Sequence, residues 1–318
     1  STMNNYEHRL IKFISKADGN DSKKYLKDFL DGSLYMNTLN YFWNEYYIEL
    51  AKKNRGKQCI NSEIDDFKLK TMVSGQSDLY EGVVYTIKAN QEILEPDLNN
   101  HLNSDVFLRA HGFGYCNVLS FYRLDYMLID KYGYYPFVEY NLNDKMKDFG
   151  EYVVIIDDEE KLLKRIGKSA DEQNYKYLCG NVRYRDYIKD GIIAPEKNTI
   201  TIKLDGEIDI DFVNQYKNAE KKRNCFDKMS NYAYQNEWRT VLYRGVQSVD
   251  AYRLEIGNIR DICHWVKSED IIEALDEDFK KGVKSGTSGY YGNVSKTELR
   301  DLFNKLGNNK AEMIGIIG

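Results

Sequence analysis

The sequence predicts an α+β fold. Segments rich in β-branched and aromatic residues, typical of strands, alternate with amphipathic segments typical of helices. They follow no regular strand–helix–strand period, which disfavours a doubly wound parallel sheet. With 318 residues, 42% hydrophobic and 30% charged, the chain has the composition of a globular protein with one large domain or two ordinary ones.

Strands and helices are expected at positions set by local composition and capping signals. The expected strands are 10–14, 34–37, 83–87, 117–122, 152–156, 181–184, 199–202, 232–243 and 252–257. The expected helices are 23–30, 144–149, 158–167, 211–216, 267–279 and 299–306. The run Tyr-Val-Val-Ile-Ile at 152–156 is expected to be buried on both faces. Ser295 and Glu298 form a capping-box pattern before the last helix.

The domain organisation is expected to change near residue 266. Residues 1–266 carry most of the strand signals, and 267–318 are expected to form a small helical extension. Between the last two helices, residues 282–293 are rich in Gly and Ser, which is typical of a linker or flexible loop.

Charge and cysteine content restrict the function. The net charge of −5 argues against a general electrostatic grip on nucleic acid. The five cysteines are widely spaced without a CxxC motif, and only four histidines occur, so neither a disulfide framework nor a metal centre is expected. The polar N-terminus shows no signal-peptide pattern and no apolar run is long enough to span a bilayer, so a reduced, cytoplasmic setting is expected.

The segment 232–243 carries the most informative pattern. On a strand, side chains alternate between faces, so Gln235, Glu237 and Arg239 would share one face. The opposite face would carry large, mainly apolar side chains: Tyr232, Tyr234, Asn236, Trp238 and Leu242. A structural alternative stays open, because an antiparallel strand often has one wet polar face, where Glu237 and Arg239 would form an ordinary ion pair.

Dispersed motifs over roughly residues 8–265 resemble the DUF2971-type family of bacterial proteins. In chain order they are 30–35 (Leu-Asp-Gly-Ser-Leu-Tyr), 77–82 (Ser-Asp-Leu-Tyr-Glu-Gly), 118–121 (Val-Leu-Ser-Phe), Met146 with Gly150, and 237–239 (Glu-Trp-Arg). The last is the most specific. This chain departs from the family pattern by an insertion before Glu81 and by a missing Trp-x-x-Tyr.

The order of these parts also resembles an ADP-ribosyltransferase with a split β-sheet core and flanking helices. That resemblance implies that Glu237 is the catalytic carboxylate, assisted by Gln235, and that NAD is the substrate that supplies ADP-ribose. It places Lys12 near the NAD diphosphate, and Ser120 with either Phe121 or Tyr122 near the nicotinamide. Arg239, the cation beside the carboxylate, completes the expected NAD-binding set.

The resemblance also bears on the acceptor. Gln-x-Glu enzymes of this kind often modify amide side chains or guanine bases, so a macromolecular acceptor, protein or nucleic acid, is expected. A setting in bacterial or phage conflict follows by analogy alone. Two alternatives stay open: a non-enzymatic interaction protein on the same scaffold, and a nucleic-acid-processing enzyme, which the acidic balance disfavours.

Two further polar segments receive structural interpretations. The run 157–160 (Asp-Asp-Glu-Glu) has the residues of a metal site, but it stands where a helix N-terminus favours negative charge. We therefore interpret it as a helix start. His264 and Trp265 are expected to serve packing rather than catalysis.

Overall fold

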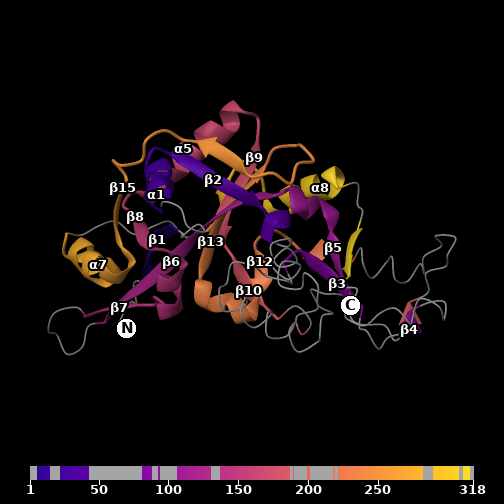
Figure 1. Ribbon diagram of the computed structural model, residues 1–318, viewed down its shortest axis with the longest axis horizontal. Helices are drawn as coiled ribbons and strands as arrows, with labels where there is room; N and C mark the ends of the chain where they lie inside the picture. The colour runs from indigo at the N-terminus through magenta and orange to yellow at the C-terminus, as the bar shows by residue number, and fades with distance from the viewer. Residues whose placement is uncertain are drawn as a thin grey trace, which may run out of the picture.

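The computed structural model confirms an α+β protein with a mostly antiparallel sheet (Figure 1). It describes residues 6–14, 22–42, 81–87, 92–93, 106–129, 137–186, 189, 199–200, 218, 221–281, 289–307 and 311–315. The expected helix at 211–216 and most of the expected linker after residue 281 lie outside the described residues.

The main sheet contains ten described strands, and all neighbouring strands in it are antiparallel. Seven follow the order β15-β8-β1-β6-β13-β9-β16: β15 (Cys263–Lys267), β8 (Tyr152–Ile156), β1 (Tyr6–Ile14), β6 (Asn117–Ile129), β13 (Glu237–Tyr243), β9 (Lys176–Asn181) and β16 (Tyr291–Gly292). The other three pair at the side of this path: β2 (Ser33–Thr38), β7 (Phe137–Tyr140) and β14 (Tyr252–Glu255).

Three small sheets accompany the main one. A three-stranded antiparallel sheet joins β3 (Val83–Ile87), β5 (Val106–Ala110) and β17 (Ala311–Gly315). Two parallel pairs join β10 (Arg183–Arg185) with β12 (Asp227–Met229), and β4 (Glu92–Ile93) with β11 (Thr199–Ile200).

Helical elements cover both faces of the main sheet. In the described part of the chain the helices include α1 (Ser22–Leu30), α5 (Glu159–Glu172), α7 (Ile271–Lys280) and α8 (Lys296–Leu306), with 3-10 turns η1 (His111–Tyr115), η2 (Asp144–Phe149), η3 (Ser230–Gln235) and η4 (Ser268–Asp270). Apolar residues of α1 and α5 pack with Phe121 and Trp238 in one core cluster. On the other face, α7 and η2 pack with Ile11 and Tyr122 in a second cluster. None of the described helices is long and apolar enough to cross a bilayer.

Strand β8 lies between these two clusters, as its sequence predicts. All five of its residues are buried. Val154 and Ile156 contribute to the α1/α5 cluster, while Val153 and Ile155 contribute to the α7/η2 cluster. A strand buried on both faces needs an unbroken apolar run, and this is why 152–156 gave the clearest signal.

The main sheet forks between β1 and β6. The two strands pair from Tyr6 opposite Met127 to Ile11 opposite Tyr122. Beyond that point β1 remains paired with β8 as far as Ile14, whereas the first residues of β6 pair with β2 instead. On this edge of β6, residues 119–121 are therefore unpaired, between the ladder with β1 and the ladder with β2. The other edge of β6 stays paired with β13 over the same residues.

The strand expected at 232–243 begins only at Glu237. Residues 230–235 form the 3-10 turn η3, and Asn236 follows in the left-handed conformation with φ of 33°. The expected sharing of one face by Tyr232, Tyr234 and Trp238 is therefore wrong. Trp238 lies in the α1/α5 cluster, whereas Tyr234 packs at the edge of the α7/η2 cluster.

The C-terminal residues contain strands as well as helices. Strand β16 pairs with β9 in the main sheet, and β17 pairs with β5. Helix α8 starts with the expected capping box of Ser295 and Glu298 and lies against η1. The contact is close, since a Cβ on Gly112 would lie 1.8 Å from the carbonyl oxygen of Phe303. A domain boundary at residue 266 stays a prediction.

Candidate active site

A buried cluster of charged side chains surrounds Glu237 at the start of β13. Arg239 lies two residues along the same strand face and donates from Nε to Glu237 Oε1 at 2.5 Å and from Nη2 to Oε2 at 3.4 Å. The same guanidinium pairs with Glu81 and donates to the carbonyl oxygen of Cys225 at 2.8 Å. Glu237 and Arg239 lie on one face of the strand, as the sequence predicts, but that face is buried and not exposed to solvent.

Lys228 joins Gln235 to Glu237. Its Nζ donates to Gln235 Oε1 at 2.7 Å and to Glu237 Oε2 at 3.2 Å. Gln235 belongs to η3 and not to the strand, so alternation along a strand cannot bring it beside Glu237. The left-handed Asn236 turns the chain between them, and its own carbonyl oxygen accepts a hydrogen bond from Arg123 N at 2.8 Å. The two side chains thus meet through a shared cation.

Ser120 and Lys12 reach this cluster from the fork in the sheet. The Ser120 hydroxyl donates to Glu237 Oε1. The Ser120 carbonyl oxygen lies in the pairing gap of β6 and accepts a hydrogen bond from Lys12 Nζ at 2.8 Å. Lys12 therefore bridges from β1 to β6 at the point where the two strands separate.

The Glu237 carboxylate is fully engaged by these neighbours. A carboxylate offers about four lone-pair sites. Ser120 and Arg239 Nε occupy Oε1, while Lys228 and Arg239 Nη2 occupy Oε2. Any further partner of Glu237 must displace one of these donors.

The cluster also sets the ionisation of its members. Burial by itself would raise the pKa of Glu237, but Arg239 and Lys228 outweigh it and hold that pKa well below its usual value. Burial lowers the pKa of Lys12 to about 8, against an opposing effect of Glu237. Around Arg239 the buried acids Glu81 and Glu237 face the buried cations Lys228 and Arg239.

Tyr122 and Phe121 serve the cores beside the site. Tyr122 lies opposite Glu237 in the β6–β13 ladder, but its ring packs edge-on against Phe13 and its hydroxyl donates to the Asn141 carbonyl oxygen at 2.7 Å. Phe121 packs edge-on against Trp238 on the opposite face of the sheet. Both rings are buried in these apolar clusters, so neither offers an exposed face on which nicotinamide could stack.

Of the expected site residues, the structure brings Lys12, Ser120, Gln235, Glu237 and Arg239 together, and it places Tyr122 in the packed core beside them. Sequence reasoning gave no role to Glu81, Lys228 or Tyr184. The Tyr184 hydroxyl accepts a hydrogen bond from the Glu237 backbone N–H at 2.8 Å. Residues 224–230 (Asn-Cys-Phe-Asp-Lys-Met-Ser) mix polar and apolar side chains, so the sequence around Lys228 gave no signal for its role.

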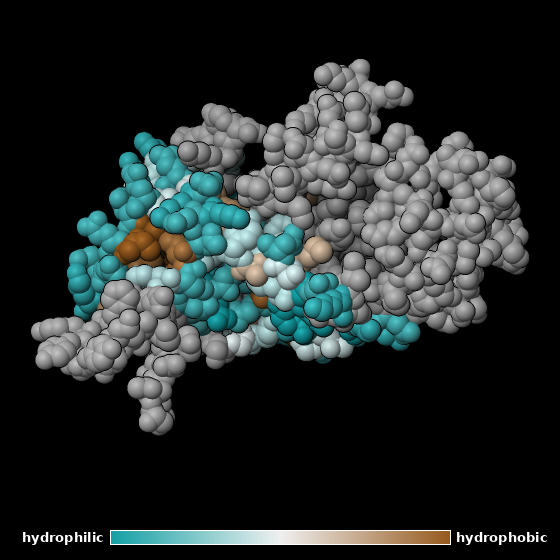
Figure 2. Space-filling view, turned by 90° about the horizontal axis from the view of Figure 1, so that it is seen from below, coloured by the Kyte–Doolittle hydropathy of each residue, from teal (hydrophilic) through white to brown (hydrophobic). Residues whose placement is uncertain are grey.

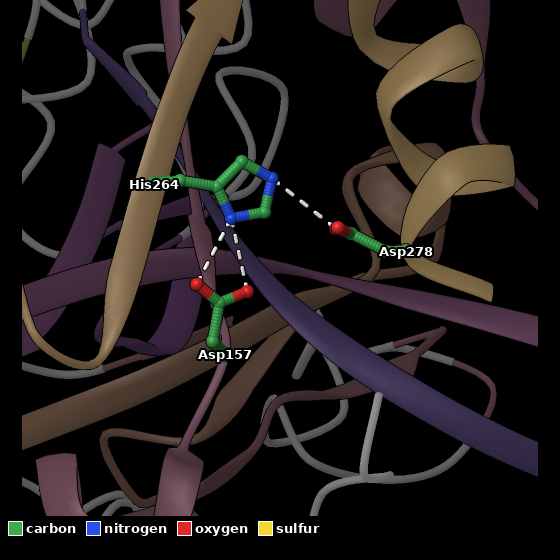
Figure 3. Close-up of side chains that lie close together, drawn as sticks. All are labelled: Asp157, His264 and Asp278. Atoms are coloured by element: carbon green, nitrogen blue, oxygen red, sulfur yellow. Dashed lines mark hydrogen bonds and ion pairs between the residues drawn. The ribbon is translucent and has the colours of Figure 1, made fainter. Parts of the chain in front are cut away.

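A second polar cluster lies at the far edge of the sheet (Figure 3). His264 on β15 stands between two carboxylates: its Nδ1 faces Asp157 at 2.9 Å and its Nε2 faces Asp278 of α7 at 3.2 Å. Arg9 Nη2 also pairs with Asp157 Oδ1 at 2.7 Å. His264 thus forms ion pairs, beyond the packing role expected from its sequence, whereas Trp265 does pack against Tyr152.

This second cluster fits a protonated histidine better than a metal ion. The three side chains have ligand atoms within 4.8 Å of one another. However, the two carboxylates approach opposite nitrogens of one ring, and a metal binds only one of these nitrogens at a time (Figure 3). The neighbouring run 157–160 does start a helix as expected, with Asp158 accepting from Lys161 N at 3.0 Å.

Comparisons with family models, with curated proteins and with solved structures each found no match.

The described surface visible in Figure 2 is mainly hydrophilic, and its most strongly hydrophobic patch lies towards the end of the molecule where α7 lies in Figure 1.

Proposed function

We propose that this protein is an NAD-dependent ADP-ribosyltransferase that modifies a macromolecule, with Glu237 as its catalytic carboxylate. One observation carries the proposal. The resemblance assigns roles to Lys12 on β1, Ser120 on β6 and Glu237 on β13. One hydrogen-bonded chain joins these residues: Lys12 donates to the Ser120 carbonyl oxygen, and the Ser120 hydroxyl donates to the Glu237 carboxylate.

The fork in the main sheet supports an ADP-ribosyltransferase-like split sheet. Strands β1 and β6 are joined by six residue pairs and then separate, so residues at the fork face a region between the two strands that their pairing does not fill. Lys12 and Ser120 stand at this fork. In the proposed enzyme NAD approaches Glu237 from there.

The proposed reaction needs an ionised carboxylate near the ribose. The bond between nicotinamide nitrogen and the ribose C1′ breaks, nicotinamide leaves with the bonding electrons, and positive charge develops on the ribose. Glu237 stabilises that charge and binds the ribose 2′-hydroxyl. A nucleophile of the acceptor then bonds to C1′ and loses its proton. The depressed pKa of Glu237 keeps its carboxylate ionised for this role.

The other residues have separable roles in this proposal. Lys12 supplies a cation for the NAD diphosphate, and Gln235 orients a polar group of the acceptor. Arg239 positions Glu237, because its guanidinium is held by protein groups: Glu81, Glu237 and the carbonyl oxygen of Cys225. Tyr122 does not fit as a stacking partner for nicotinamide, since its ring packs against Phe13 and its hydroxyl is hydrogen-bonded to the Asn141 carbonyl oxygen.

The ribose hydroxyl has to displace a donor from Glu237. Arg239 holds both carboxylate oxygens from the same strand, so it is the least able to leave. Ser120 can turn its hydroxyl away by rotation about one bond, and Lys228 can withdraw along a flexible side chain. The proposal therefore includes a rearrangement of Ser120 or Lys228 when NAD binds.

The direct test is transfer of label from labelled NAD to macromolecules of a bacterial lysate. The wild-type protein should release nicotinamide and label an acceptor, while Glu237→Gln should do neither at equal concentrations of folded protein. Glu160→Gln is the matched control, because Glu160 makes an exposed ion pair with Lys164 on α5 and should leave both reactions unchanged. Equal activity of Glu237→Gln and wild type contradicts the assignment.

A non-enzymatic interaction protein is the second candidate. It is favoured by one observation: the Glu237 carboxylate is 7% exposed and already has four donors, as expected for an ionic cluster that serves only the fold. Absence of NAD binding in the wild-type protein selects this candidate. For either function, a cytoplasmic setting and a role in bacterial or phage conflict remain proposals.

A further inference from the structure

Two cysteines far apart in sequence lie against each other near the charged cluster. Cys116 Sγ and Cys225 Sγ are 3.5 Å apart, although 109 positions separate the two residues. Both are buried, and both are free thiols. The widely spaced cysteines gave no indication of such a pair in the sequence.

The other described cysteines have different partners. Cys179 Sγ lies 3.4 Å from the Thr240 hydroxyl, and Cys263 Sγ donates to the carbonyl oxygen of Ile259 at 3.1 Å. Among the cysteines that the structure describes, Cys116 and Cys225 are therefore the two placed for a sulfur–sulfur bond.

The pair is connected to the segments that carry the candidate site. Cys116 lies directly before β6, which carries Ser120, and Cys225 lies just before β12, which carries Lys228. The carbonyl oxygen of Cys225 accepts a hydrogen bond from Arg239 Nη1 at 2.8 Å. A bond between the two sulfurs would tie these segments to each other beside the Arg239 guanidinium.

We propose that Cys116 and Cys225 form a reversible disulfide when the protein meets a small peroxide oxidant. One thiol loses its proton, its thiolate attacks an oxygen of hydrogen peroxide, and the O–O bond breaks to give a sulfenic acid and a hydroxide, which takes up that proton to form water. The second thiol likewise loses its proton, and its thiolate attacks the sulfenic sulfur and expels a hydroxide that becomes the second water. In total, two thiols lose two electrons and two protons, and one peroxide is reduced to two waters.

To form the disulfide, the two sulfurs must move closer together, and because both thiols are buried their oxidation is slow. The sulfurs must approach from 3.5 Å to the disulfide bond length of about 2.05 Å, and the proposal assigns this approach to a small shift of the residues before β12. Burial raises the pKa of the Cys116 thiol, so its reactive thiolate is scarce and oxidation proceeds during local opening. Formation over minutes to hours is expected, not within seconds.

The test is disulfide mapping of the folded wild-type protein after treatment with hydrogen peroxide. The protein is alkylated, digested without reductant and analysed by mass spectrometry. The expected product is a cross-linked peptide joining Cys116 to Cys225, which disappears after treatment with dithiothreitol. If both cysteines are recovered as alkylated free thiols, or if they are cross-linked to other cysteines, the proposal is overturned.

A thermal measurement gives an independent readout that involves no NAD. Oxidation should raise the thermal midpoint of the wild-type protein, because the closed loop restricts the unfolded chain. Cys179→Ser should keep this rise and Cys225→Ser should lose it. A rise of equal size in Cys225→Ser means that another modification causes it, which contradicts the disulfide. Should Cys225→Ser fail to fold, Cys116→Ala provides the same comparison.

Discussion

Ser120 and Glu237 are hydrogen-bonded across the β6–β13 ladder, although 117 positions separate them in the chain. The contact is diagonal, because Ser120 lies directly opposite Arg239 and Glu237 lies opposite Tyr122. The hydroxyl and the Arg239 Nε thus hold the same carboxylate oxygen from two neighbouring strands. This fixes the orientation of Glu237 at the fork where Lys12 approaches β6.

The charge balance of the cluster makes Glu237→Gln costly for folding. The substitution removes one of the two buried acids that pair with Arg239 (Glu81 and Glu237) and leaves Lys228 and Arg239 in excess over Glu81. Loss of one partner from a buried ionic group costs about 3–5 kcal/mol. We expect a decrease of this size in the free energy of unfolding, measured by urea denaturation.

The double variant Glu237→Gln/Lys228→Met tests that explanation. It removes one acid and one cation together and leaves Arg239 paired with Glu81. Its free energy of unfolding should lie well above that of Glu237→Gln alone. A double variant as unstable as the sum of the two single variants would show that the charges of Lys228 and Glu237 are not coupled.

Trp238→Ala should destabilise the protein strongly. The indole is 2% exposed and packs edge-on against Phe121, with ring centroids 5.7 Å apart. Truncation of a buried large aromatic side chain typically costs about 3–5 kcal/mol. Trp265→Ala is the control, since this tryptophan is 48% exposed on edge strand β15. Similar thermal midpoints for the two variants would contradict the placement of Trp238 in the core.

NAD binding should weaken at alkaline pH through Lys12. Its pKa of about 8 lies below the ordinary lysine value of 10.5, so its ammonium loses its charge as the pH rises through about 8. The dissociation constant for NAD should increase over that range. Lys12→Arg keeps its charge there and should flatten the profile. A profile that is unchanged in Lys12→Arg removes Lys12 from NAD binding.

Gln235→Ala should separate NAD hydrolysis from transfer. Gln235 can only orient a polar partner, whereas Glu237 stabilises charge on the ribose. The variant should still hydrolyse NAD to ADP-ribose and nicotinamide, and it should lose transfer to the macromolecular acceptor. Both reactions are measured side by side with labelled NAD, with and without lysate. A parallel loss of both would mean that Gln235 acts on NAD through its contact with Lys228.

The stabilising contribution of His264 should be greatest in acid and should be lost as the pH rises. Its hydrogen bond to Asp157 raises its pKa above the ordinary 6.5, and the charge of Asp278 adds to this against the opposing effect of burial. The contribution is complete below about pH 6.5 and is lost as the pH rises through the higher folded-state value. His264→Gln should therefore be less stable than wild type in acid and should approach it in alkali. A pH-independent difference in urea midpoints would argue against a charged His264.

The sequence predicts those elements of the fold whose signals are local. Ser295 and Glu298 form the expected capping box, and the run 152–156 forms a strand buried on both faces. The turn η3 was wrongly expected to be strand, because Tyr232 and Tyr234 favour strands in general while the left-handed Asn236 ends the turn. Left-handed geometry at an Asn is permitted by its short polar side chain but is not specified by it.

The site was predicted in part, and for a physical reason. The strand pattern placed Glu237 beside Arg239, and a resemblance supplied Lys12 and Ser120. The contacts of Lys228 and Glu81 depend on segments that meet only in the folded chain, so no local pattern indicates them. Gln235 was expected beside Glu237 through strand alternation, and it is there through a turn and a shared lysine instead.

The most direct test of the central proposal is a titration of wild-type protein with NAD, followed by measurement of released nicotinamide. Wild-type protein should bind NAD saturably and release nicotinamide. Glu237→Gln, at matched concentrations of folded protein, should release none. A wild-type protein that neither binds NAD nor releases nicotinamide contradicts the proposed activity and leaves the charged cluster at Glu237 as a structural feature of an interaction protein.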